Sequence, residues 1–224
     1  MSVAIIAAHP DDEILGVGAT AARHVDGGDD VHVLILATGA LSRTTGTAAA
    51  VSDLERAARQ AAEVLGTRPP RFLGLPDNRL DSLDLLDVVQ AVEAFVADVA
   101  PRIVYTHHHG DLNVDHGITQ RAVLTACRPL PGGTVRAIHA FETLSSTEWA
   151  AGDPGDAFRP NRYVEVTATL DRKMRALEAY ASEMRDFPHP RSAQAVRALA
   201  ALRGAQVGVE AAEAFMVTRE VDRL

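Results

Sequence analysis

The chain has 224 residues, 47% of them hydrophobic, and a formal net charge of −8 at pH 7. This length and composition are typical of one folded α/β domain over residues 1–224 and exclude a disordered chain. The negative charge argues against a nucleic-acid partner, and no apolar run approaches the roughly 20 residues of a membrane span. Because Cys127 is the only cysteine and no signal peptide follows Met1, we expect a cytoplasmic protein.

Apolar runs alternate with helical periodicity along the first two thirds of the chain. Strands are predicted over residues 3–8, 31–38, 71–75 and 103–106, and helices over residues 12–25, 51–65, 83–99 and 115–128. Ser52 and Glu55 form a candidate capping box of the second helix, which ends at Gly66, and Asp115 is a candidate N-cap of the fourth. The less regular last third predicts strands over 135–141, 163–166 and 212–219 and helices over 170–180 and 193–203.

Strands that alternate with helices predict a Rossmann-like, doubly wound and mostly parallel sheet with right-handed crossovers. In the usual strand order 3-2-1-4, the first and fourth strands are neighbours, and the winding reverses between them. The crevice at their carboxyl ends is the place where such sheets bind ligands. We therefore expect the functional site in the loops that follow these two strands.

Both of these loops are rich in histidine and aspartate. The first is the run Ala-His-Pro-Asp-Asp-Glu at residues 8–13, and the second, residues 107–116, holds four of the nine histidines. His9 and Asp12 have i, i+3 spacing, which points both side chains the same way, and His116 comes from the facing loop. Two imidazoles and one carboxylate predict one catalytic zinc ion per chain, although iron(II) suits the same donors.

Asp11 is adjacent to these ligands but is expected to point elsewhere, so it is a candidate general base for the attacking water. The simpler interpretation is that Asp11 and Asp12 cap the first helix while His9 packs against the turn. The convergence of two such loops at one crevice argues against that simpler interpretation.

Five further residues are candidates for substrate binding: Arg43, Asp77, His109, Asp111 and His189. Arg43 lies in a Gly-, Ser- and Thr-rich loop, Asp77 follows the third strand, and His189 stands between two prolines. Each of these three also has a simpler explanation, as a solvated loop charge, an Asx turn and a surface turn, respectively.

The two loop motifs, with Asn113-x-Asp115-His116 in the second, resemble the LmbE/PIG-L family of zinc-dependent N-deacetylases. Members hydrolyse N-acetyl groups from sugars such as N-acetylglucosamine conjugates. The resemblance covers essentially the whole chain, and the segments 145–149 and 188–192 are similar to one bacterial branch. It implies an LmbE-like fold, metal ligands His9, Asp12 and His116, the general base Asp11, and a substrate-binding role for Asp77.

The chain departs from the family pattern at Asn113, where many members have a histidine that polarises the substrate carbonyl. An amide can still donate to an oxyanion but does not titrate, and His107, His108 or His109 could instead take this role. We expect the zinc to polarise an acetamide, Asp11 to take a proton from the attacking water, and Asp11 then to protonate the leaving amine.

Other functions stay open at this point. The same chemistry could act on a non-sugar N-acyl substrate, and the scaffold could serve as a non-catalytic sugar- or nucleotide-binding module. No Gly-x-Gly-x-x-Gly turn follows the first strand, which counts against a dinucleotide site, and the histidines favour zinc over a magnesium phosphotransfer centre. The Ala-rich helices are compatible with a homo-oligomer as well as with a monomer.

Overall fold

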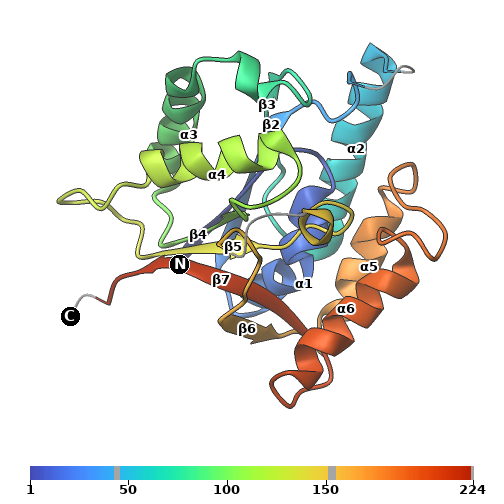
Figure 1. The fold of residues 1–224 in the computed structure, drawn as a ribbon. Helices are drawn as coiled ribbons and strands as arrows, with labels where there is room; N and C mark the ends of the chain where they lie inside the picture. The colour runs from blue at the N-terminus through green and yellow to red at the C-terminus, as the bar shows by residue number, and fades with distance from the viewer. Residues whose placement is uncertain (43–45, 151–154, 223–224) are drawn as a thin grey trace.

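Seven strands form one sheet in the order β3-β2-β1-β4-β5-β7-β6 in the computed structural model, which describes residues 1–42, 46–150 and 155–222 (Figure 1). The strands are β1 (Ser2–Ala7), β2 (Asp30–Ala37), β3 (Arg71–Leu75), β4 (Ile103–His107), β5 (Ala137–Phe141), β6 (Arg162–Glu165) and β7 (Ala212–Glu220). The first five strands are parallel, and β7 is antiparallel to both β5 and β6. The predicted mostly parallel sheet and the order 3-2-1-4 are confirmed.

Six helices of the described part of the chain cover the two faces of this sheet. They are α1 (Asp12–Asp26), α2 (Ala48–Leu65), α3 (Leu85–Val99), α4 (Val114–Ala126), α5 (Leu170–Glu178) and α6 (Ala193–Ala205), with 3-10 turns at Leu80–Ser82 and Thr147–Trp149. One apolar cluster joins the sheet to α1, α2, α5 and α6, and a second joins it to α3 and α4 (Figure 1). Along β1, Val3 and Ile5 face the first cluster and Ala4 and Ile6 the second, which explains the unbroken apolar run.

Two predicted helix caps are wrong. The helix α2 begins at Ala48 because the Thr47 side chain accepts a hydrogen bond from the backbone N–H of Ala50 at 3.1 Å, so Ser52 and Glu55 lie inside the helix and form no capping box. The cap of α4 is Asn113 rather than Asp115, whose carboxylate is buried and bonded elsewhere. The predicted stop at Gly66 is confirmed, with the left-handed φ of 82° that glycine adopts easily.

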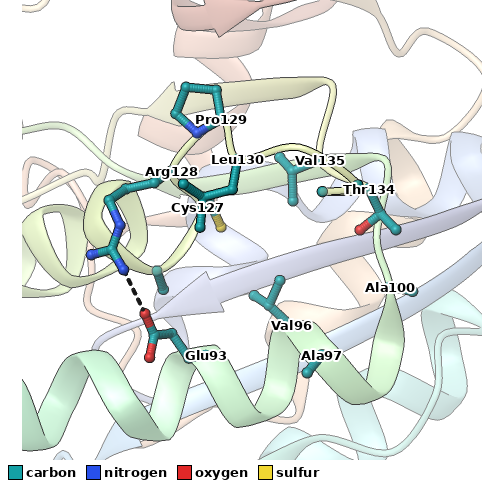
Figure 2. A pocket seen from close by; sticks show the side chains of 13 residues that line it. Glu93, Val96, Ala97, Ala100, Cys127, Arg128, Pro129, Leu130, Thr134 and Val135 are labelled. Atoms are coloured by element: carbon teal, nitrogen blue, oxygen red, sulfur yellow. Dashed lines mark hydrogen bonds and ion pairs between the residues drawn. The ribbon is translucent and has the colours of Figure 1, made fainter.

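A cavity of about 340 Å³ lies between the second half of α3 and the segment that follows α4 (Figure 2). These segments lead into the starts of β4 and β5, so this cavity lies at the amino edge of the sheet, away from the predicted site. Its described lining contains no histidine and one carboxylate, Glu93, which is paired with Arg128 at 3.2 Å. Cys127 lines it, and burial raises the pKa of its thiol to about 11, which disfavours the nucleophilic thiolate form at neutral pH.

Within the described ranges, every helix is too short or too polar to cross a lipid bilayer.

Candidate active site

The cavity at the switch point is built by loops that follow five neighbouring parallel strands. Because β1 and β4 are neighbours, the loops after them face each other, and the loops after β2, β3 and β5 complete the walls together with the segment between α5 and α6. The cavity has a volume of about 180 Å³. Its described lining consists of His9, Pro10, Asp11, Asp12, Leu15, Gly39, Ser42, Asp77, Asn78, Asn113, His116, Thr143, Ser145, Ser146, Glu183 and Arg191.

His9, Asp12 and His116 come together in this cavity. Asp12 Oδ2 lies 3.3 Å from His9 Nδ1 and 3.3 Å from His116 Nε2, and one donor atom from each residue lies within 4.8 Å of the other two. All three side chains are buried. The structure thus brings together the three residues that the sequence analysis predicts as metal ligands, with the donor set of a catalytic zinc site.

Each of the two imidazoles has a second carboxylate behind it. His9 Nε2 lies 3.0 Å from Asp115 Oδ2, and His116 Nδ1 lies 3.0 Å from Asp111 Oδ1, so the opposite nitrogen of each ring faces Asp12. Histidines that bind metals commonly have such a partner, which fixes the ring orientation and tautomer. Burial opposes protonation of His116, but Asp12 and Asp111 raise its pKa to about 9. The cluster therefore favours positive charge, and its donors fit a divalent cation.

A second group of metal-type side chains, His9, Asp77 and Asp115, also converges. Its carboxylates already accept hydrogen bonds: Asp115 from two backbone N–H groups at 2.7 and 2.9 Å, and Asp77 from the N–H and hydroxyl of Ser42 at 3.0 and 2.7 Å. Asp115 also contacts His9, and this contact orients the imidazole. The hydrogen bonds that the two carboxylates accept from neighbouring residues hold them in place without a cation.

Asp11 has a strained backbone, with a φ of 104° that few residues other than glycine adopt. It precedes α1, yet its side chain makes no capping hydrogen bond. Its backbone N–H instead donates to Glu13 Oε2 at 3.0 Å, and Glu13 Oε1 accepts from the hydroxyl of Tyr180 at 2.5 Å. The Asp12 carboxylate accepts from the backbone N–H of His9 rather than capping the helix. The simpler capping interpretation of these two aspartates is therefore wrong.

Arg191 is the most important described residue of the cavity that the sequence analysis misses. Its Nη1 lies 3.0 Å from Asp11 Oδ2 and 3.5 Å from Glu183 Oε2. Burial and the neighbouring Asp12 carboxylate raise the pKa of Asp11 well above its usual range, and Arg191 acts in the opposite direction. Asp11 is thus a buried carboxylate that lines the cavity and is held by a cation, which suits a general base.

Asn113 caps the helix α4 and also lines the cavity. Its Oδ1 accepts from the backbone N–H of Asp115 at 2.9 Å, which fixes the orientation of the amide as the cap of α4. Its Nδ2 therefore carries the N–H groups, one of which donates to Asn78 Oδ1 at 3.0 Å. Among the described residues, Asn78 is the one acceptor of this amide, and Asn113 lines the cavity.

The three consecutive histidines of the second loop lie outside the described lining of the cavity. His107 Nε2 accepts a hydrogen bond from the backbone N–H of Ala8 at 2.9 Å, so the ring is neutral, and burial lowers its pKa well below the usual value. The Nε2 atom of His108 lies 2.7 Å from the backbone oxygen of Asp156. His109 is 43% exposed and lies 3.6 Å from Asp156 Oδ1. None of the three is placed as an imidazolium donor toward the cavity.

The other predicted substrate-binding residues occupy different positions. Asp77 is buried and lines the cavity. Asp111 lies behind His116 instead, with its side chain 1% exposed and hydrogen-bonded to the hydroxyls of Ser146 and Thr147. His189 lies outside the described lining and stacks edge-on against Trp149, and Arg43 falls outside the described residues.

A protein-family model described as "PIG-L: GlcNAc-PI de-N-acetylase" matches residues 4–127, which are 124 of the 224 residues. The chain belongs to the PIG-L family. The matched region includes both loops of the cavity, from His9 to His116. The resemblance seen in the sequence is thereby confirmed.

Two relatives whose names state an activity match this PIG-L protein over most of their length. The probable N-acetyl-alpha-D-glucosaminyl L-malate deacetylase 2 of Bacillus cereus is 28% identical, covering 81% of this chain and 83% of the relative. The 1D-myo-inositol 2-acetamido-2-deoxy-alpha-D-glucopyranoside deacetylase of Mycolicibacterium smegmatis is also 28% identical, covering 83% and 81%. Both relatives are named for deacetylation of an N-acetylated glucosamine conjugate.

The fold of this PIG-L protein also occurs in an enzyme named for other chemistry. The structure of GalB, the 4-carboxy-2-hydroxymuconate hydratase of Pseudomonas putida KT2440, superposes with a TM-score of 0.80 at 21% identity, covering 100% of this chain and 99% of GalB. At that identity the likeness shows the shared fold alone. The reaction must therefore be argued from the side chains of the site.

Proposed function

We propose that this chain is a zinc-dependent N-deacetylase that releases acetate from an N-acetylglucosamine-type sugar or sugar conjugate. The observation that carries the proposal is the buried cluster of His9, Asp12 and His116, with a carboxylate behind each imidazole and a separate carboxylate, Asp11, beside it. Its occurrence on the two loops of a PIG-L chain, and the names of the two relatives, support the same reaction.

His9, Asp12 and His116 would hold one zinc ion per chain. A zinc ion in such a site lowers the pKa of a bound water to about 7 and polarises a carbonyl group. Iron(II) fits the same donors, so the identity of the metal is part of the proposal. Asp111 and Asp115 keep the two imidazoles oriented, which assigns Asp111 a role behind His116 in place of the predicted contact with substrate.

Asp11 takes the proton from the attacking water and later delivers it to the nitrogen of the departing amine. Its raised pKa makes it a stronger base than an exposed carboxylate, and Arg191 keeps it in position. The second N–H of Asn113 stabilises the oxygen on which negative charge develops. Acetate and a free amine are the products.

Asp77 is the described carboxylate best placed to accept a hydrogen bond from a hydroxyl group of the sugar, because it lines the cavity beside Ser42. Contacts of substrate with Arg43 and His109 stay predictions. So do the single functional domain over residues 1–224, the cytoplasmic location and the absence of a nucleic-acid partner.

The test is acetate release by purified protein that has been stripped of metal and then titrated with zinc or iron(II). The substrates are N-acetylglucosamine linked to malate, to myo-inositol and to methanol. We expect activity to rise to a plateau near one metal ion per chain, and Asp11→Ala to bind the metal but lose turnover. Binding of metal without acetate release from any N-acetyl sugar would contradict the proposed substrate class, and failure to bind a divalent metal would contradict the site itself.

A further inference from the structure

Leu15 is the one large apolar side chain in the described lining of the active-site cavity. Of the other described lining residues, Pro10 and Gly39 are apolar, and the rest carry carboxylate, imidazole, amide, hydroxyl or guanidinium groups. The Pro10 ring already packs against Gly39, where an added Cβ would lie 2.7 Å from Pro10 Cδ. Leu15 is therefore the main apolar surface that the described lining offers to a ligand.

The place of Leu15 on α1 directs its side chain toward the groups that carry the proposed chemistry. Leu15 lies three residues after Asp12, the first residue of α1, and its backbone N–H donates to the backbone oxygen of Asp11 at 2.9 Å. Side chains on a helix lean toward its N-terminus, so the Leu15 side chain covers the turn that begins at Asp12. Asp11 and Asp12 line the same cavity. Leu15 thus forms the wall next to the proposed base and a proposed metal ligand.

The backbone around Leu15 is held by buried contacts with three other elements. Its backbone oxygen accepts a hydrogen bond from Lys173 Nζ of α5 at 2.7 Å, and Lys173 is paired with Glu213 of β7 at 2.6 Å. The next residue, Gly16, lies so close to β5 that an added Cβ would be 2.2 Å from a ring carbon of Phe141. The wall that Leu15 forms therefore has a fixed position.

The proposed reaction determines which part of the substrate meets this wall. The amide carbon that water attacks carries three substituents. Its oxygen turns to the groups that stabilise negative charge, and its nitrogen leads to the sugar, so the methyl group takes the remaining direction. A methyl group placed against the carboxylates or amides of the cavity would leave them without hydrogen-bond partners, whereas Leu15 forms no hydrogen bond with its side chain.

The size of the cavity restricts the acyl group further. Its volume of about 180 Å³ is below the roughly 300–1,000 Å³ of pockets that enclose drug-sized ligands. Because α1 is fixed at Leu15, an additional methylene group would have to displace a packed side chain, which is unfavourable.

We propose that the Leu15 side chain is the acyl-binding wall of the cavity, against which the methyl group of the acetyl substrate packs, and that this wall excludes acyl groups longer than acetyl. The proposal rests on the proposed function and names the residue that sets its acyl specificity. Leu15 transfers no proton and binds no metal, so its contribution is separate from those of Asp11 and the proposed ligands.

The first test is kinetic and compares the N-formyl, N-acetyl, N-propionyl and N-butyryl forms of one glucosamine conjugate by release of the free amine. In the wild type, kcat/KM should fall about 10–200-fold from acetyl to propionyl, the usual effect of one methylene group in an apolar pocket. Each substrate is then compared with itself across variants, so the intrinsic reactivity of each acyl group cancels.

Leu15→Ala should reverse this preference. It should lower kcat/KM for the acetyl substrate about three- to tenfold by loss of the methyl contact, and raise it for the propionyl and butyryl substrates. The formyl substrate has no methyl group, so its value should stay close to that of the wild type. Leu15→Val is the milder variant for the case that Leu15→Ala does not fold, and should reduce the acetyl-to-propionyl ratio about fourfold, the equivalent of one buried methylene group.

Leu65→Ala is the matched control. Leu65 is the last residue of α2, is 2% exposed, and belongs to the same apolar cluster as Leu15, which is 5% exposed, but it lies outside the described lining of the cavity. The same substitution should destabilise the core to a similar extent and keep the acyl preference of the wild type. An equal change of preference in Leu65→Ala would attribute the effect to destabilisation and overturn the proposal.

The second test needs no turnover. Acetate, propionate and butyrate, the acids released from three of the substrates, are titrated into metal-loaded wild type and Leu15→Ala and followed by calorimetry. We expect the wild type to bind acetate more tightly than butyrate, and Leu15→Ala to show the opposite order.

The outcomes separate this proposal from the proposed function. If acetate is released but the Leu15 variants keep the wild-type order of acyl groups, the proposal is wrong and the deacetylase assignment stands. If the wild type hydrolyses propionyl and butyryl substrates as readily as acetyl, the size limit is wrong. If the wild type releases no acyl group, the proposed function fails, and the titrations alone decide: a reversed order in Leu15→Ala supports the wall, and an unchanged order overturns it.

Discussion

Lys173→Met should destabilise the protein by about 3–5 kcal/mol, because Lys173 is one half of a buried ion pair. Its Nζ lies 2.6 Å from Glu213 Oε1 and donates to the backbone oxygen of Leu15 at 2.7 Å, and both charged side chains are 6% exposed. Glu213 also accepts the backbone N–H groups of Ala19 and Thr20, at 3.1 and 2.7 Å. These contacts are with the middle of α1, the helix that begins at Asp12.

The magnitude follows from what the substitution leaves behind. Methionine replaces the aliphatic stem of Lys173, so little packing is lost, but the carboxylate of Glu213 keeps only its two N–H donors and no counter-charge. Glu213→Gln alone leaves the buried ammonium group unpaired, at a similar cost. The double variant carries no buried charge and mainly loses one acceptor for a backbone N–H, which costs about 1–3 kcal/mol. It should therefore be much more stable than the sum of the two single changes, which is about 6–10 kcal/mol.

The assay is urea unfolding of metal-stripped protein, extrapolated to water. A parallel thermal scan should show a fall of about 2–4 °C in Tm for each kcal/mol in a chain of this length. Arg172→Met is the matched control, since its partner Asp26 is 48% exposed and surface pairs of this kind contribute about 1 kcal/mol or less. A Lys173→Met variant as stable as the control, or a double variant that shows the full sum, would refute the reasoning.

Three further outcomes are expected. Asp11→Asn should keep the metal stoichiometry and lower kcat about 10²–10⁴-fold, measured by acetate release, because a general base is removed. Asp111→Asn should weaken metal binding about 10–100-fold in a chelator competition, because His116 loses its orienting carboxylate. Burial lowers the pKa of His139 to about 4, so the folded state disfavours its protonated form and stability is lost as the pH falls below about 6.5. Between pH 7 and 5 this loss is about 2 kcal/mol, and it should be absent from unfolding curves of His139→Leu.

The sheet, and the position of the site at the carboxyl ends of its strands, could be predicted because both follow from patterns within short segments of the sequence. Unbroken apolar runs separated by helical periodicity define a parallel sheet, and the order of its strands then places the loops after β1 and β4 at one crevice. The three proposed ligands come from those loops, so their convergence follows from the topology. The turn at Gly66 could be predicted for a similar reason, since its left-handed φ depends on the residue itself.

The errors and omissions concern side chains whose partners are distant in the sequence. Arg191 is 180 residues from Asp11, and nothing near either residue indicates that they meet. Aspartate is a common N-cap, so the sequence predicts Asp115 at the helix end, whereas its carboxylate contacts His9 and accepts hydrogen bonds from backbone groups after β3. One signal was present: a histidine that binds a metal needs a partner for its second nitrogen, and the second loop offers two aspartates for that purpose.

The strain at Asp11 explains why so many charged residues occur within the first motif. Asp12 must turn toward the imidazoles while Asp11 lines the cavity beside Arg191, and consecutive helical residues would not provide that divergence. A φ of 104° at Asp11 provides it, at a cost of about 1–3 kcal/mol. Glu13 offsets that cost by accepting the Asp11 N–H, and the Tyr180 hydroxyl holds Glu13. The third acidic residue of the motif thus stabilises the conformation in which the first two can act on different parts of the reaction.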